Sequence, residues 1–511
     1  MSASRRAFLR SAAASAIALP LSLRAQTGDL SPRLFQHGVA SGDPLADRVI
    51  LWTRVTSPPT RSAIGPIEVS WQIADDERMT KVVGRGTAAA APERDFTVKV
   101  DAGGLQPGRT YFYAFDAGGQ QSPVGRTRTM PARGVERLRL GVVSCSNYPA
   151  GYFNAYRGVA NRDDLDAVLH LGDYIYERSD DPYGGSAAIG RVPLPVGEAV
   201  SLADYRQRYA VYRSDPDLQD VHRLHPFIVV WDDHEIANDA WSGGSATHTA
   251  AQGNWATRLA AAYRAYVEWL PVREAPEGGR RLYRAFRAGG LADLIMLDTR
   301  GGRDRQITAA TARDVSDPRR TVLGAAQETW LFDQLKQSTR EGTTWRLLGQ
   351  QVLFATLSPA GTPLSVDMWD GYPAARTRVV DFLAREKVGD VAILTGDLHS
   401  SWALDVAANP WAAAGSAAAR ALAVEVVTPA ISSAPLFADA TLRERALLLR
   451  AKAPHVKFLD GDSNGYVVLD ITRERLQAEW HFVSTVRDRA DREIRGAAFV
   501  CERGSSRLVP A

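Results

Sequence analysis

The sequence predicts a layered α/β protein that is preceded by an all-β domain. From residue 137 onwards, short apolar strands alternate with helical segments, which is the order of elements in layered α/β domains. Before residue 130, short runs rich in β-branched and aromatic residues are instead separated by Gly, Pro and Asp. The 511 residues are enough for two or three domains, and 45% hydrophobic and 23% charged residues are typical of a globular protein.

The first 25 residues have the composition of an export signal. Arg5-Arg6 precede an uncharged apolar stretch, residues 11–23, and small residues lead to Ala25-Gln26. The paired arginines resemble a twin-arginine signal, so we expect the twin-arginine machinery to export the protein and residues 1–25 to be removed. The mature protein is then periplasmic or secreted. A basic N-terminal helix or a single membrane anchor is the alternative, but the stretch is short for a span.

Charge and hydropathy exclude several other classes of protein. Without residues 1–25, the chain has 57 basic and 58 acidic residues, and its formal charge falls from +3 to −1. We therefore expect no nucleic-acid-binding surface. No later stretch has 18 uninterrupted apolar residues, so no membrane span is expected after the signal. We expect a monomer.

Residues 33–130 are predicted to form a small β-sandwich. Its strands include Val49–Val55, Ile67–Ile73 and Phe96–Val100. The run Leu105–Tyr113 resembles the turn and following strand of fibronectin-type and immunoglobulin-like sandwiches, in which a tyrosine closes the corner. Residues 131–134, Pro-Ala-Arg-Gly, are expected to link this domain to the next.

Residues 137–500 are predicted to form the α/β domain. Its strands are expected at Leu138–Val143, Ala167–Leu171, Phe227–Val230, Leu294–Leu297, Arg346–Leu348 and Val391–Leu394, and its helices at Trp255–Leu270, Gln327–Lys336 and Arg376–Arg385. The strands are short continuous apolar runs, which is typical of strands that are buried on both faces.

Four of these strands are followed by residues that can bind metal ions. They are Cys145 after the first strand, Asp173 and Tyr176 after the second, Asp232, Asp233, His234, Glu235 and Asn238 after the third, and Asp397 and His399 after Val391–Leu394. Each cluster alone has an ordinary explanation, such as a buried thiol, an acidic helix start or an incidental turn histidine. Four clusters together fit the edge at which open α/β sheets bind ligands.

The types of side chain predict a site for more than one metal ion. Tyr176 is the most informative residue, because a phenolate needs a strong Lewis acid such as ferric iron to lose its proton at neutral pH. The Cys145 thiolate also favours a transition metal, and calcium would take the remaining carboxylate and carbonyl oxygens. Asp173 could bridge two metals, as in the two-metal hydrolysis of phosphate esters.

These motifs resemble those of a known enzyme group. Gly172–Tyr176, Asp233–Glu235 and Gly396–His399 are similar, in this order, to the motifs of calcineurin-like metallophosphoesterases, except that Asp233 stands where most members have asparagine. This departure points to the branch of PhoD-type alkaline phosphatases. Further segments that resemble this branch are Cys145, Tyr205–Tyr209, Trp231–Glu235 and Trp369–Pro373. The twin-arginine signal and the N-terminal sandwich match it too.

The resemblance implies an αββα-type layered metallophosphoesterase fold and an exported enzyme that hydrolyses phosphomonoesters, phosphodiesters or both. It implies that Fe3+ is held by Cys145, Asp173, Tyr176 and His399. It also implies that Ca2+ is held by Asp173, Asp233 and Asp397, with Asn238 at a second calcium or at the phosphate. His234 would lie over the phosphate and assist the leaving group, and Asp232 would orient the site. His234, Asp173 and Asn238 are thus the expected catalytic residues, and small phosphate esters the expected substrates.

Two other functions remain open. The same fold could carry a phosphodiesterase that resembles phospholipase D in its substrates, because substrate range depends on the pocket rather than on the metal ligands. Alternatively, the β-sandwich could be the working module of a non-catalytic cell-surface binding protein. The apparently complete set of metal ligands argues against this last interpretation.

Overall fold

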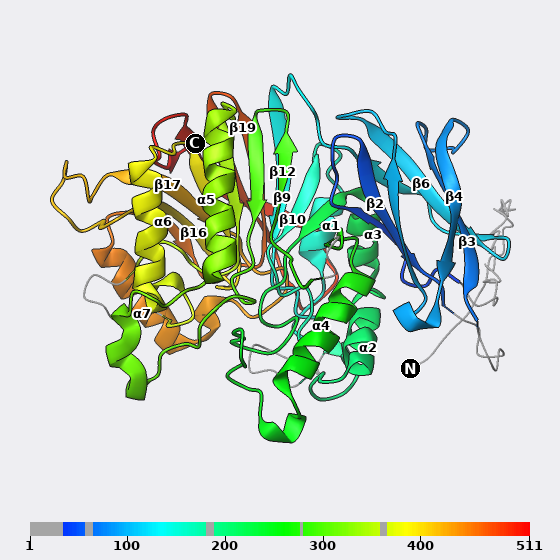
Figure 1. The fold of residues 1–511 in the computed structure, drawn as a ribbon, viewed down its shortest axis with the longest axis horizontal. Helices are drawn as coiled ribbons and strands as arrows, with labels where there is room; N and C mark the ends of the chain where they lie inside the picture. Colours follow the sequence, from blue (N-terminus) through cyan, green and yellow to red (C-terminus); the bar gives the residue numbers. More distant parts are fainter. Residues whose placement is uncertain (1–33, 57–64, 180–188, 276–278, 358–364) are drawn as a thin grey trace, which may run out of the picture. The chain divides into compact units, whose positions relative to one another are not determined.

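The computed structural model describes residues 34–56, 65–179, 189–275, 279–357 and 365–511 (Figure 1). The predicted export signal, residues 1–25, lies outside the described residues. Within the described ranges, no helix combines the length and the apolar character that crossing a membrane requires.

Two large sheets form the centre of the α/β region. From edge to edge, the ten-stranded sheet consists of β22 (Val509–Pro510), β21 (Glu493–Glu502), β20 (Arg475–Val483), β19 (Gly465–Thr472), β9 (Arg137–Val143), β10 (Ala167–His170), β11 (Pro226–Val229), β1 (Val39–Gly42), β2 (Arg48–Arg54) and β5 (Thr97–Gly103). The seven-stranded sheet consists of β12 (Arg284–Ala288), β13 (Ala292–Met296), β14 (Trp345–Gly349), β15 (Val391–Thr395), β17 (Ala421–Val427), β16 (Ser401–Ala407) and β18 (Val456–Asp460).

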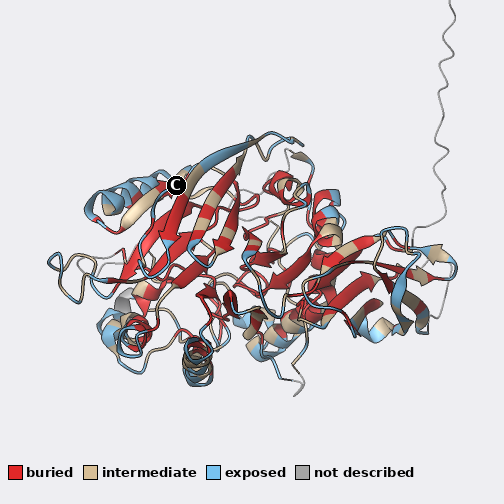
Figure 2. Ribbon diagram, turned by 90° about the horizontal axis from the view of Figure 1, so that it is seen from above, coloured by how far each residue is buried: buried red, intermediate tan, exposed pale blue. Residues whose placement is uncertain are grey.

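The two sheets pack face to face, and helices cover their outer faces. Apolar side chains of β9 and β10 pack against those of β13, β14 and β15 in one buried cluster. Helices α1 (Asn154–Ala160), α2 (Leu202–Tyr212), α3 (Pro216–Leu224) and α4 (Trp255–Trp269) pack on the ten-stranded sheet, and α5 (Gly324–Arg340) and α6 (Pro373–Arg385) on the seven-stranded sheet. Figure 2 shows the strands buried between partly exposed helices. This αββα arrangement confirms the predicted fold class.

The N-terminal region is all-β, as predicted. A five-stranded sheet contains β4 (Val82–Ala90), β3 (Ile67–Ala74), β6 (Thr110–Ala117), β7 (Gln120–Gln121) and β8 (Gly125–Arg128). Its apolar face shares one buried cluster with β1, β2 and β5. At the start of β6, the Tyr111 hydroxyl accepts a hydrogen bond from the Gln106 N–H at 2.8 Å, which closes the corner that the sequence indicated.

One layer of this sandwich continues into the ten-stranded sheet, which the sequence did not indicate. Strand β1 pairs in parallel with β11, with Ser41 opposite Pro226 and Gly42 opposite Phe227. The buried Asp43 then accepts a hydrogen bond from the Arg273 N–H at 2.7 Å and pairs with Arg284 at 2.6 Å. The predicted limits of the two domains stay a prediction, but their β-structure is shared.

Gly42 is the residue that permits this junction. A Cβ at this position would lie 2.4 Å from the carbonyl oxygen of Pro271 and 2.7 Å from that of Phe227. We expect Gly42→Ala to destabilise the protein by roughly 1–3 kcal/mol, because the backbone around it must move. Urea unfolding measures this loss. Gly389→Ala is the matched control, since a Cβ there meets nothing within 4 Å. Equal stabilities of the two variants would contradict the prediction.

Candidate active site

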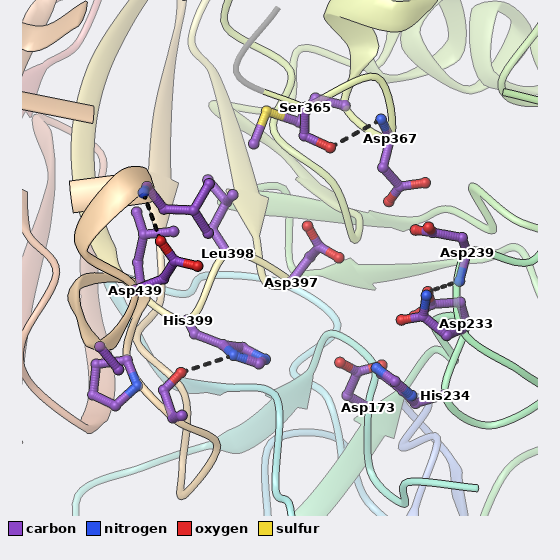
Figure 3. A pocket seen from close by; sticks show the side chains of 17 residues that line it. Asp173, Asp233, His234, Asp239, Ser365, Asp367, Asp397, Leu398, His399 and Asp439 are labelled. Atoms are coloured by element: carbon purple, nitrogen blue, oxygen red, sulfur yellow. Dashed lines mark hydrogen bonds between the residues drawn. The ribbon is translucent and has the colours of Figure 1, made fainter. Parts of the chain in front are cut away.

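The segments that follow β10, β11 and β15 line one pocket. Its volume is about 500 Å³. Six of the residues singled out in the sequence line it, namely Asp173, Asp233, His234, Asn238, Asp397 and His399. Figure 3 shows Asp173, His234, Asp397 and His399 pointing toward one another. The strand ends at which the sequence predicts a ligand therefore border a pocket in the structure.

Tight turns at the strand ends aim these side chains. Cys145, Asp173, Asp397 and His399 all have a positive φ, between 50° and 60°. Such a conformation costs a non-glycine residue about 1 kcal/mol or more, and it is found most often at functional sites. Gly172, at φ 112°, precedes Asp173, and a Cβ on it would lie 2.4 Å from the Asp232 Cβ. Only glycine lets the ends of β10 and β11 come so close.

The predicted metal ligands form three overlapping groups. Within each group, one ligand atom per residue lies within 4.8 Å of the others, and the groups are Cys145–Asp173–His399, Asp173–Asp233–His234 and Asp232–Asp233–Asp397. Tyr176 belongs with the first group, because its Oη lies 3.0 Å from Asp173 Oδ2 and 3.0 Å from His399 Nε2. Asp173 is shared by two groups, as a bridging carboxylate must be.

The carboxylates of these groups fit a cation. Asp173 Oδ1, Asp232 Oδ2 and Asp233 Oδ1 are buried and make no hydrogen bond within the described part of the chain. Burial raises the pKa of Asp173 well above its ordinary value, and neighbouring carboxylates raise it further. Burial and the nearby Asp232 raise the pKa of Asp397 in the same way. Ionised carboxylates in such a place require positive charge, which bound metal ions supply.

The thiol points to the same conclusion. Burial and the neighbouring Asp173 raise the pKa of Cys145 well above that of an ordinary thiol, so the protein alone does not stabilise a thiolate. Metal coordination removes that proton. Cys145 and Cys501 are both free and buried cysteines.

Glu235 fixes the two loops that carry the first ligands. Its buried carboxylate accepts hydrogen bonds from the backbone N–H groups of Asp173 at 3.1 Å, Tyr174 at 2.5 Å and Asp232 at 2.7 Å. These groups belong to the segments after β10 and β11. The Glu235 side chain therefore connects the segments after β10 and β11 and fixes the separation of Asp173 and Asp233.

Glu177 and Tyr176 hold the ring of His234. The imidazole Nδ1 lies 2.7 Å from Glu177 Oε2, and the rings of Tyr176 and His234 are 4.1 Å apart at an angle of 30°. Burial lowers the pKa of His234, but Glu177 and Asp173 outweigh burial and raise the pKa well above its ordinary value. The other oxygen of Glu177 accepts the Asn238 N–H at 2.8 Å. Glu177 thus orients the imidazole of His234 at the pocket and favours its protonated form.

Arg300 is a residue of the site that the sequence analysis missed. It is fully buried, and its Nη1 donates to Asp367 at 2.8 Å, while its Nη2 lies 3.4 Å from Asp397 and 3.7 Å from Asp233. Its Nε donates to Asp232, so Asp232 faces this guanidinium. A signal was present, because Arg300 follows the apolar strand Leu294–Leu297 as closely as the other clusters follow theirs.

Ser433 was also missed. Its hydroxyl donates to the Tyr176 oxygen at 2.7 Å and lies 3.0 Å from the Cys145 carbonyl oxygen. Ser433 belongs to the loop after β17, and nothing in its neighbours suggests a metal site. Only the tertiary structure brings it to Tyr176.

The chain is similar to known proteins over most of its length. The model of the PhoD-like phosphatase family matches residues 140–480, and the model of the PhoD-like phosphatase N-terminal domain matches residues 22–131. Alkaline phosphatase D of Bacillus subtilis (strain 168) is 37% identical over 489 residues, which cover 93% of this chain and 82% of that protein. A solved structure of PhoD superposes with a TM-score of 0.84 at 34% identity and covers 94% of this chain and 93% of that chain.

These matches confirm the resemblance that the motifs indicated, over both the α/β and the N-terminal region. The chain belongs to the PhoD-like phosphatase family.

Proposed function

We propose that the protein is a metal-dependent phosphoric ester hydrolase whose reaction takes place in the pocket around Asp173. The observation that carries the proposal is that Asp173 belongs to two groups. One group has the thiol of Cys145, the phenol of Tyr176 and the imidazole of His399, and the other has Asp233 and His234. A donor set of this kind suits two ions of different hardness.

The ligand types support Fe3+ at Cys145, Asp173, Tyr176 and His399. They support Ca2+ at Asp173, Asp233 and Asp397, with Asn238 beside a second calcium or the phosphate. When bound, the ions neutralise phosphoryl oxygens and lower the pKa of water. Asp232 orients the site through Arg300.

His234 has the position and the charge of a proton donor to the leaving group. It lines the pocket, and its contact with Glu177 favours the imidazolium form. Glu177 acts through His234 and is therefore a positioning residue. Phosphomonoesters, phosphodiesters or both remain the proposed substrates. A phospholipase-like diesterase would have the same metal ligands and would differ from a phosphomonoesterase only in the residues that line the rest of the pocket.

Export by the twin-arginine pathway is part of the proposal. The motif at Arg5-Arg6 and the apolar residues 11–23 support it. The protein would then act as a monomer in the periplasm or after secretion, where small phosphate esters are its partners.

Replacement of Tyr176 tests the metal assignment. We expect purified protein matured with both metals to contain iron and calcium, to hydrolyse 4-nitrophenyl phosphate, and to show a visible phenolate-to-iron absorption band. Tyr176→Phe should lose the band and most of the hydrolysis. Elemental analysis and an absorption spectrum measure both. Tyr174→Phe is the matched control, because the Tyr174 hydroxyl contacts His222 at 2.9 Å and belongs to none of the ligand groups. A wild type without iron, or a band that survives in Tyr176→Phe, would refute the assignment.

Replacement of Ser433 tests whether its hydroxyl tunes the phenolate. Ser433→Ala removes a 2.7 Å hydrogen bond to the Tyr176 oxygen. The phenolate then becomes a stronger electron donor, so the same absorption band should move to longer wavelength. Ser432→Ala is the control, since its hydroxyl instead donates to the Asn147 carbonyl oxygen at 2.8 Å. An unmoved band in Ser433→Ala, with iron still bound, would contradict this role.

Replacement of Glu177 tests the proton donor. A poor leaving group such as an alkoxide needs the proton of His234, whereas 4-nitrophenolate leaves without it. We therefore expect Glu177→Gln to lower kcat about 100-fold for an alkyl phosphate but only a few-fold for 4-nitrophenyl phosphate. Glu198→Gln is the control, because Glu198 pairs with Arg258 at 2.7 Å and does not line the pocket. An equal loss on both substrates would leave Glu177 with a structural role only.

A further inference from the structure

We infer that the pocket contains a second subsite, which binds an uncharged apolar group of the phosphate ester. This subsite rests on the proposed function, since it takes the organic part of the substrate whose phosphoryl group lies at Asp173. Four side chains form what we call the apolar wall, namely Leu398, Pro435, Leu436 and Leu442.

The apolar wall lies across the pocket from Asp233 and Asp239 (Figure 3). In Figure 3, Leu398 and Asp439 lie on one side of His399, and Asp233 and Asp239 lie on the other. The wall comes from Leu398 and from a segment that runs through η6 (Leu436–Ala438) into helix α7 (Ala440–Lys452). An ester whose phosphoryl group reaches Asp173 and Asp397 can place its organic group against this segment, because the segment lines the same pocket.

Hydrogen bonds fix the wall relative to the predicted metal ligands. The Leu436 N–H donates to the His399 carbonyl oxygen at 3.0 Å, and His399 Nδ1 lies 3.0 Å from the Ala434 carbonyl oxygen. Asp439 caps α7 by accepting the N–H groups of Thr441 at 2.8 Å and Leu442 at 2.9 Å. Leu436 and Leu442 are thus held on either side of this cap.

The charge of the pocket excludes an anionic organic group. Among the described residues that line it, none is Lys or Arg, and Asp239, Asp367 and Asp439 add carboxylates beyond the proposed ligands. Arg300 and Arg303 are fully buried, and both are paired with Asp367. A second phosphate or a carboxylate on the substrate would meet the carboxylates of Asp239, Asp367 and Asp439 there, whereas an apolar group gains burial.

Three inhibitors that share one phosphate group test the subsite. They are methyl phosphate, hexyl phosphate and 5-carboxypentyl phosphate, and their inhibition of 4-nitrophenyl phosphate hydrolysis is measured on the metal-loaded full-length protein. We expect the inhibition constant of hexyl phosphate to be about tenfold lower than that of methyl phosphate, because burial of about two extra methylene groups would give this difference. The carboxylated chain should inhibit no better than methyl phosphate.

Leu442→Ala then locates the effect. We expect the ratio between hexyl and methyl phosphate to fall to about threefold, while inhibition by orthophosphate is unchanged. Leu448→Ala is the matched control, because Leu448 is on the same helix but 54% exposed and not part of the pocket. Its ratio should equal that of the wild type.

The outcomes separate the subsite from the proposed function. A wild type that hydrolyses the ester but binds methyl and hexyl phosphate equally overturns the subsite alone. So does an unchanged ratio in Leu442→Ala, or tightest inhibition by the carboxylated chain. A wild type that neither hydrolyses the ester nor binds orthophosphate overturns the proposed function instead.

Discussion

The structure depends on holding carboxylates of like charge together in a buried pocket. Asp173, Asp232, Asp233 and Asp397 converge there, and burial with mutual repulsion raises the pKa of Asp173 and Asp397. Part of the compensation is built into the chain, because Arg300 reaches three of these aspartates from a fully buried position. The oxygens that it does not satisfy face the pocket. The buried carboxylates therefore need additional positive charge, which the proposed metal ions would supply.

The second requirement is that the predicted metal ligands are held in fixed positions. Glu235 collects three backbone N–H groups from the segments after β10 and β11, and Gly172 lets those segments touch. Asp173, Asp232 and Asp233 thus lie in short segments directly after two neighbouring buried strands, and hydrogen bonds to Glu235 hold these segments in position. A site on such rigid elements needs little rearrangement when the ions and the phosphoryl group arrive.

The sequence predicts those parts of the site that obey a local rule. Cys145, Asp173 and Asp233 each follow an apolar strand of one sheet, and that position predicts that they lie at the same edge, whereas Asp397 follows a strand of the second sheet. Arg300 also follows an apolar strand, but a guanidinium cannot bind a metal ion, so its position does not predict a metal ligand. Other contacts have no local signature. The partners Glu177 and His234 are 57 residues apart in sequence, and Ser433 and Tyr176 are 257 apart. Likewise, β1 has the pattern of any strand, and the local sequence indicates neither its pairing with β11 nor the close approach of the backbone at Gly42.

His399 connects the two sides of the pocket. Burial and the neighbouring His234 lower the pKa of His399 to about 4, so its ring is neutral and carries a single proton. Nδ1 lies 3.0 Å from the carbonyl oxygen of Ala434, which can only accept a hydrogen bond, so the proton is on Nδ1. The lone pair is then on Nε2, the nitrogen that lies 3.0 Å from the Tyr176 oxygen. The segment that carries the apolar wall thereby selects the tautomer that can bind a metal ion. A shift of that segment would disturb the metal ligand and the organic subsite together, which ties the choice of substrate to the reactivity of the centre.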